Sequence, residues 1–96
     1  MLHLVFQSPI ELALLERIAV GDDLVFLENA VLRILEKGSL CNRLTACLEH
    51  NRLYVLADDL EVRGIQLSEL VTGIEVIDYA GLVALTIKNP VIQSWS

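Results

Sequence analysis

The chain has 96 residues, of which 54% are hydrophobic and 21% charged, and its formal net charge at pH 7 is −6. This length suits one domain with a single modest core. The acidic balance excludes a protein that grips a nucleic-acid backbone by itself, because such binding depends on clustered Lys and Arg. The hydrophobic excess is hard to hide in so small a core, so we expect an apolar patch that meets another subunit.

We expect a soluble cytoplasmic protein, because no targeting or membrane segment is recognisable. The first residues lack the positive charge of a secretory signal, and Pro9 ends their apolar run early. No apolar stretch approaches the roughly 18 residues that span a membrane. Cys41 and Cys47 are the two cysteines, and their close spacing in one expected helix makes no disulfide framework.

The first half of the chain alternates short apolar runs with amphipathic segments. Leu2–Phe6 and Leu24–Leu27 are apolar runs that predict buried strands. Ile10–Val20 has the three-four spacing of an amphipathic helix. Two further helices are predicted over Ala30–Glu36 and Leu40–His50.

One strand–turn–helix unit in the second half is clearer than the rest. Leu53–Leu56 is apolar at consecutive positions, which fits a strand buried on both faces. Asp58 and Asp59 come next, and either acid can cap a helix start. The short helix Leu60–Arg63 follows, and Gly64 is the residue type that usually lies just past a helix C-terminus.

The remaining elements complete an alternating pattern. Ile74–Ile77 predicts a strand, Asp78 a turn or cap, Tyr79–Ile87 a helix and Val91–Trp95 a short closing strand. Four or five strands that alternate with helices predict a mostly parallel sheet with right-handed crossovers. We therefore expect a three-layer α/β/α sandwich, with residues 1–96 forming a single domain.

Acids and amides follow the predicted strands, at the edge where open parallel sheets bind ligands. Helix capping is the preferred interpretation of these acids. A Mg²⁺ site built from Asp58, Asp59 and Asp78 is the alternative, but acids at strand ends are common without metal. The glycine-rich cradles of nucleotide sites are absent, so we expect no cofactor and no metal. The polar residues concerned are Gln7, Ser8, Glu28, Asn29, Asp58, Asp59 and Asp78.

The histidines and cysteines carry little chemistry on their own. His3 is expected to be a hydrogen-bonded strand residue, and His50 to lie at a helix C-terminus. Cys41 falls in the first turn of the Leu40–His50 helix, where the positive helix end favours a thiolate, so it is the one candidate for accepting sulfur. Cys47 lies on the apolar side of that helix and is expected to be structural.

A set of short segments, in a fixed order over nearly the whole chain, resembles the TusB/DsrH branch of the DsrE-like family. The clearest piece runs from Tyr54 to Leu60 and closes on Arg63-Gly64. Any one piece is weak, but all of them in this order and at this length are fairly specific. The other pieces are Met1-Leu2-His3, Gln7-Ser8-Pro9, Asp22 to Leu27 with Glu28-Asn29-Ala30-Val31, Ile77-Asp78-Tyr79, Leu82-Val83, Leu85-Thr86, Lys88 and Trp95.

The resemblance implies a subunit of a sulfur relay. In this family TusB, TusC and TusD subunits assemble as a dimer of heterotrimers, which takes persulfide sulfur from TusA and passes it to TusE. The sulfur ends as the 2-thio group of the wobble uridine in certain tRNAs. The resemblance therefore implies TusC/DsrF-like and TusD/DsrE-like partners in a heterohexamer, a TusA-like donor and a TusE/DsrC-like acceptor. It implies no direct contact with nucleic acid or membrane.

The resemblance transfers no catalytic residue to this chain. The principal persulfide cysteine of the family belongs to the TusD/DsrE subunit. Some DsrH members carry a cysteine in the first helix, about where this chain has Leu14. We therefore expect a non-catalytic subunit of a sulfurtransferase complex. Two alternatives stay open: a DsrH subunit of a DsrEFH complex in sulfur oxidation, and an enzyme-like subunit that accepts sulfur on Cys41.

Overall fold

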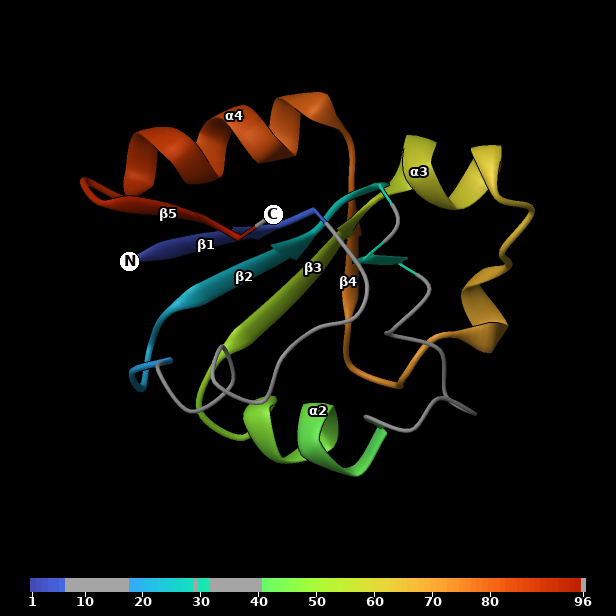
Figure 1. The fold of residues 1–96 in the computed structure, drawn as a ribbon, viewed down its shortest axis with the longest axis horizontal. Coiled ribbons are helices and arrows are strands. Elements are labelled where there is room, and N and C mark those ends of the chain that lie inside the picture. The colour runs from blue at the N-terminus through green and yellow to red at the C-terminus, as the bar shows by residue number, and fades with distance from the viewer. Residues whose placement is uncertain (7–17, 29, 32–40, 96) are drawn as a thin grey trace.

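Within residues 1–6, 18–28, 30–31 and 41–95, which the computed structural model describes, five parallel strands form one sheet (Figure 1). The strand order is β4-β3-β2-β1-β5, and every neighbouring pair is parallel. The mostly parallel sheet predicted from the sequence is confirmed. The strands are β1 (Leu2–Val5), β2 (Asp23–Phe26), β3 (Arg52–Leu56), β4 (Glu75–Ile77) and β5 (Ile92–Trp95).

Helices cover both faces of the sheet, which confirms the predicted three-layer sandwich (Figure 1). Leu85 of α4 is buried against one face, while Leu44 of α2 and Leu60 of α3 are buried against the other. None of the helices within the described ranges is long and apolar enough to cross a membrane. The described helices are α2 (Cys41–Cys47), α3 (Ala57–Val62) and α4 (Tyr79–Lys88), and a 3₁₀ turn, η2, spans Leu67–Glu69.

The two central strands are buried on both faces because their apolar residues are consecutive. Along β2, Leu24 and Phe26 face α2, while Val25 faces α4. The parallel register places Leu24 beside Leu53 and Phe26 beside Val55, so the same face of β3 continues this layer. Each large apolar side chain buried in this way contributes roughly 1.5–3 kcal/mol.

Helix α4 is fixed to the sheet at both of its ends. Asp78 is its N-cap, and the Asp78 carboxylate accepts a 2.8 Å hydrogen bond from the backbone N–H of Gly81, as the cap prediction required. At the other end, Lys88 and Asn89 donate to the buried carboxylate of Asp23, over 3.3 and 3.2 Å. The helix therefore runs from the carboxyl edge of β4 to the amino edge of β2.

Two predicted helices of the first half fall mainly outside the described residues. Of Ile10–Val20, residues 10–17 lie outside them, and of Ala30–Glu36, residues 32–36 do. Residues 18–20 are not helical, so the prediction was wrong at that end. The reason is local, because the backbone N–H of Ala19 donates to the Asp22 carboxylate over 3.1 Å and the chain turns towards β2.

The helix predicted over Leu40–His50 is shorter than expected. Its described part, α2, ends at Cys47. Beyond it, the backbone N–H groups of Glu49 and His50 bond three residues back, which tightens the last turn. His50 is therefore an exposed turn residue and not the last residue of a helix.

Candidate functional site

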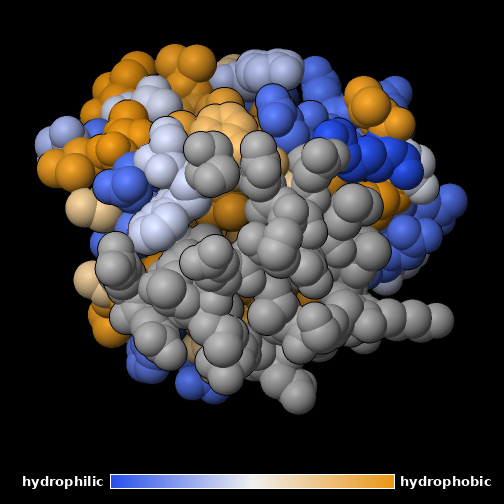
Figure 2. Space-filling model, viewed as in Figure 1, coloured by the Kyte–Doolittle hydropathy of each residue, from blue (hydrophilic) through white to orange (hydrophobic). Residues whose placement is uncertain are grey.

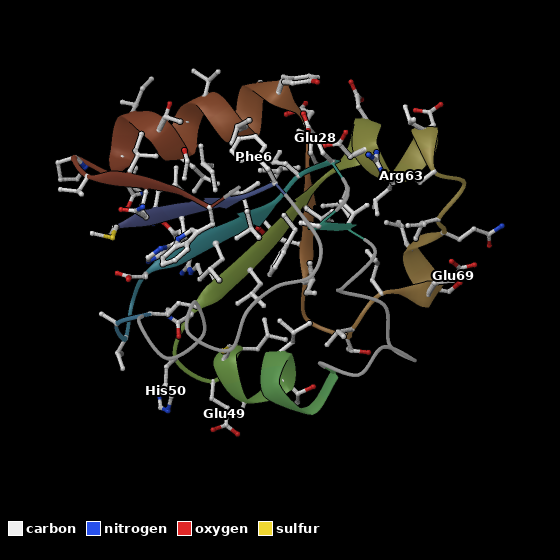
Figure 3. The ribbon with its side chains drawn as sticks, viewed as in Figure 1. Phe6, Glu28, Glu49, His50, Arg63 and Glu69 are labelled. Carbon is white, nitrogen blue, oxygen red and sulfur yellow. The ribbon has the colours of Figure 1, made fainter. Side chains whose placement is uncertain are left out.

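Two acids at the carboxyl edge of the sheet, Asp59 and Asp78, accept hydrogen bonds from backbone N–H groups. The Asp59 carboxylate accepts a 2.8 Å hydrogen bond from the backbone N–H of Glu28, which joins the end of β2 to α3. Glu28 has a left-handed backbone (φ 50°), which is uncommon for a residue other than glycine. Arg63 lies within 3.6 Å of the Asp59 carboxylate, one helical turn away, and Figure 3 shows Glu28 and Arg63 at this edge.

Asp58 and Asp59 do not cap a helix, so that interpretation was wrong. Strand β3 runs directly into α3, and the N-cap position is Leu56, which makes no side-chain cap. Both acids lie within the first turn of α3, where their negative charge is favourable at the positive helix end. Gly64 follows the helix with φ +66°, as predicted.

The acids proposed for Mg²⁺ do follow neighbouring strands, since β3 and β4 are paired. The Asp59 and Asp78 carboxylates, however, are engaged by the backbone N–H groups of Glu28 and Gly81. The described part of the chain holds no group of three His, Cys, Asp or Glu residues that could bind a metal ion. The carboxylates at this edge therefore stabilise the backbone through hydrogen bonds.

A buried polar cluster joins the N-terminal and C-terminal strands. His3 of β1 is 2% exposed, and its Nε2 lies 2.9 Å from Oδ2 of Asp22, just ahead of β2. The indole Nε1–H of Trp95 in β5 donates to Nδ1 of His3 over 3.1 Å. The amino group of Met1 lies 3.2 Å from the other oxygen of Asp22.

Asp22 is the acceptor at the centre of this cluster. Burial raises the pKa of its carboxyl group, but hydrogen bonds from His3 and the backbone of Ala19, together with the amino group of Met1, outweigh it. The net effect is a pKa below the usual range of an aspartic acid. The ionised carboxylate is therefore the stable form of Asp22 in the folded protein.

The partners of His3 fix its tautomer and exclude it as a general base. An indole N–H can only donate, so Nδ1 of His3 is the acceptor and carries no proton. The ring proton is on Nε2, which donates to Asp22. Both ring nitrogens are thus engaged, and His3 is the hydrogen-bonded strand residue that the sequence predicted.

A nitrogen NMR measurement checks this assignment. We expect the two-bond ¹⁵N–¹H correlation pattern of His3 to place a ring proton on Nε2 and none on Nδ1, with exposed His50 as the reference. Trp95→Phe is expected to shift the Nδ1 resonance of His3 and to leave His50 unchanged. A proton on Nδ1 of His3 would contradict the cluster described above.

Of the two cysteines, the structure describes the side chain of Cys47. Cys47 is half-buried against the core, and burial raises the pKa of its thiol, so it is a structural thiol as expected. Cys41 is the first described residue of α2. Whether Cys41 accepts sulfur, as the sequence suggested, stays a prediction.

The amino edge of the sheet carries a shallow hollow of about 380 Å³. Its lining mixes the basic residues His50, Arg52 and Lys88 with the acids Asp23 and Glu49. His50 and Glu49 lie at the end of the molecule opposite Glu28 and Arg63 (Figure 3). Because Asp23 already binds Lys88, the charges of the hollow largely compensate one another.

Sequence reasoning missed the acids Asp22 and Asp23, which it treated as a turn. Both are buried, and each holds partners from distant parts of the chain. One feature of the sequence could have revealed them: both acids come at the start of a strand that is apolar at consecutive positions and so buried on both faces. An acid placed there must find hydrogen-bond donors from neighbouring elements.

Comparison with known families decides the classification. The profile of a family described as "DsrH like protein" matches residues 6–91. The chain belongs to this family. The TusB/DsrH resemblance read from the short segments is confirmed, since the match covers nearly all of them.

Individual relatives agree over the full length of the chain. Protein TusB of Pectobacterium parmentieri is 35% identical over 98 residues, covering 99% of this chain and 100% of its own. Protein TusB of Erwinia tasmaniensis is 32% identical with the same coverage. Protein TusB of Escherichia coli K12 is 32% identical over 100 residues, again covering 99% of this chain and 100% of its own.

Solved structures share the fold at much lower identity. A protein of unknown function from Methanobacterium thermoautotrophicum superposes with a TM-score of 0.79 at 12% identity, over 98% of this chain and 96% of its own. The ychN protein of E. coli superposes with a TM-score of 0.78 at 16% identity, over 98% and 97%. These similarities support the sandwich architecture of the DsrH family member described above.

Proposed function

We propose that this chain is a non-catalytic subunit of a heteromeric, TusBCD-type sulfurtransferase that relays persulfide sulfur for 2-thiolation of the tRNA wobble uridine. The observation that carries the proposal is its full-length similarity to several TusB proteins. Its partners are then TusC- and TusD-like subunits in a heterohexamer, which meets a TusA-like donor and a TusE-like acceptor. The single domain acts in the cytoplasm without touching nucleic acid itself.

The uses of the polar side chains support a structural role. Both nitrogens of His3 are engaged, and the Asp59 and Asp78 carboxylates hold backbone N–H groups. Cys47 is half-buried with a raised thiol pKa, which disfavours the reactive thiolate. The histidine and the two carboxylates are therefore committed to holding the fold. The Cys47 thiol is poorly suited to carry sulfur.

Co-expression with the TusC- and TusD-like subunits of the same organism tests the proposed assembly. We expect the three chains to co-purify, and native mass spectrometry to give two copies of each. An unrelated acidic α/β protein of similar size, expressed in place of this chain, provides the control. A chain that purifies alone and leaves its relatives as a separate complex would sink the proposal.

The DsrH description of the family favours a second candidate, a subunit of a DsrEFH-type complex in sulfur oxidation. The two candidates differ in the protein that receives the sulfur. The persulfide-loaded complex would be offered a TusE-like acceptor and a DsrC-like acceptor in separate reactions. Transfer to the TusE-like acceptor supports tRNA thiolation, and transfer to the DsrC-like acceptor alone supports sulfur oxidation.

The place of Cys41 at the start of α2 keeps a third candidate, in which this chain accepts sulfur itself. We expect no gain in mass on this chain when the assembled complex receives a persulfide donor, because the sulfur resides on a partner subunit. Intact-mass analysis of each chain measures this, with Cys41→Ser as the matched control. A gain of one sulfur atom that Cys41→Ser abolishes would replace the first proposal by this one.

A further inference from the structure

Strand β5 lies at the edge of the sheet and has one partly buried side chain. Within the described residues it is paired with β1 alone. Ile92, Gln93 and Ser94 are exposed, and Figure 2 shows hydrophobic side chains at the surface over the part of the molecule where α4 and β5 lie. Trp95 packs against the core cluster that includes Val5. The side chain of Trp95 is therefore the main attachment of β5 besides its backbone pairing with β1.

A hydrogen bond to a buried histidine holds the polar end of Trp95. The indole Nε1–H donates to Nδ1 of His3 over 3.1 Å. His3 is 2% exposed, so little water is available to replace this bond if it is lost. The other ring nitrogen of His3 lies 2.9 Å from the Asp22 carboxylate. Since Nε2 already carries a proton, Nδ1 is the position at which the ring can take up a second one.

A second proton on His3 is incompatible with the bond to Trp95. Once Nδ1 carries a proton it is a donor, and the indole N–H opposite it can only donate. Two donors then face each other, and both lose their partner in a buried site. Histidine is the side chain that takes up a second proton near neutral pH. Acidification therefore acts directly on the contact that holds Trp95.

The charged groups around His3 direct the movement to Trp95. Within the described part of the chain, the charged groups of this cluster are the Asp22 carboxylate and the Met1 amino group. Asp22 stays ionised in mild acid because its pKa is lowered, so its charge keeps the protonated ring in place. Protonation of the Met1 amino group strengthens its bond to Asp22 and cannot loosen the cluster. The neighbouring acid Asp23 binds groups at the end of α4 instead.

We propose that the contact between Trp95 and His3 is a pH-sensitive latch, which holds β5 on the sheet at neutral pH and releases it when His3 takes up a second proton. Release frees the backbone groups of β1 that bond to β5. One of them is the N–H of Phe6, which donates to the carbonyl oxygen of Trp95 over 3.0 Å. The latch thus controls access to the outer edge of β1. This inference goes beyond the proposed function and does not depend on it.

Hydrogen exchange of the Phe6 amide tests the latch, because this N–H reports the pairing of β1 with the end of β5. NMR would give its protection factor at pH 8 and pH 5, which removes the pH dependence of the exchange chemistry itself. The Leu27 amide is the internal reference, since it donates to the carbonyl oxygen of Val5 and needs no contact with β5. We expect the protection of Phe6 to fall about tenfold at pH 5, the scale of one lost hydrogen bond, while that of Leu27 is unchanged.

Trp95→Phe separates the latch from simple packing, because it keeps an aromatic ring and removes the indole N–H. We expect its Phe6 amide to be less protected than the wild-type one at pH 8 and to change little at pH 5. His50→Gln is the matched control, since His50 is the other histidine and is exposed, and it should keep the wild-type response.

Three results would overturn the latch. One is equal protection of the wild-type Phe6 amide at both pH values. Another is an equal fall at Leu27, which would mean that the whole sheet loosens in acid. The third is a fall at Phe6 that persists in Trp95→Phe. The wild-type comparison of Phe6 with Leu27 decides the matter alone should Trp95→Phe fail to fold.

Discussion

Replacing Asp22 by asparagine is expected to lower the free energy of unfolding by about 2 kcal/mol at pH 7. The Asp22 carboxylate accepts from His3, from the backbone of Ala19 and from the amino group of Met1. An asparagine side chain has one carbonyl oxygen, and its NH₂ group must face a donor at one of these positions. Urea denaturation of both proteins at pH 7 measures the difference.

The effect of Asp22→Asn depends on pH in a defined direction. Because the folded state lowers the pKa of Asp22, its contribution is fully present above the pKa of an unfolded aspartic acid, about 3.9. The contribution is lost as the pH falls through the lower pKa of the folded state. The difference between wild type and Asp22→Asn is therefore expected to shrink below about pH 4.

Asp58→Asn is the matched control, because Asp58 is an exposed acid in the first turn of α3. We expect its effect at pH 7 to stay within about 0.5 kcal/mol. Equal effects of the two substitutions, or an Asp22→Asn effect that does not change between pH 7 and pH 3, would show that Asp22 is not the central acceptor of the cluster.

Replacing Gly81 by valine is expected to lower the free energy of unfolding by about 3 kcal/mol. A Cβ atom at Gly81 would meet the Cβ of Ile77 at 3.0 Å and the Cγ2 of the same residue at 3.4 Å. The Ile77 Cβ is attached directly to the backbone of β4, so it cannot move aside as the end of a flexible side chain can. The helix itself must shift, which strains the Asp78 cap.

Ala80→Val provides the control on the same helix, because Ala80 is exposed on its outward face. We expect that substitution to cost less than about 1 kcal/mol, mainly through the lower helix propensity of valine. Denaturant titration of both variants gives the comparison. Similar losses for the two positions would mean that α4 does not approach β4 as closely as the structure shows.

The parts of the fold that the sequence predicted are those governed by local pattern. The consecutive apolar residues Leu53–Leu56 predicted β3, and Asp78 predicted the start of α4. The short strand β5 was also predicted, although its pairing with β1 was not. Hydrophobic periodicity and cap chemistry act within a few residues, so they can be read along the chain.

The parts that could not be predicted depend on distant partners. Strand β2 begins at Asp23 and not at Leu24, because Asn89 and Lys88 supply donors to a carboxylate that would otherwise be unfavourable in the core. His3 was recognised as a hydrogen-bonded residue, but its bond to Trp95 joins the two ends of the chain. No local pattern encodes a contact of this kind.

If this chain is the non-catalytic relay subunit that we propose, sulfur does not pass through it, and the most direct test is thiolation by a complex whose TusB-like subunit has no cysteine. The chain has two cysteines, so Cys41→Ser/Cys47→Ala removes them both. The variant would be produced with its own partner subunits in a bacterium that lacks TusB, and the 2-thiouridine content of the tRNA measured by mass spectrometry. We predict the wild-type level of thiolation. Loss of thiolation from a complex that still assembles would contradict the account and assign the sulfur to this chain.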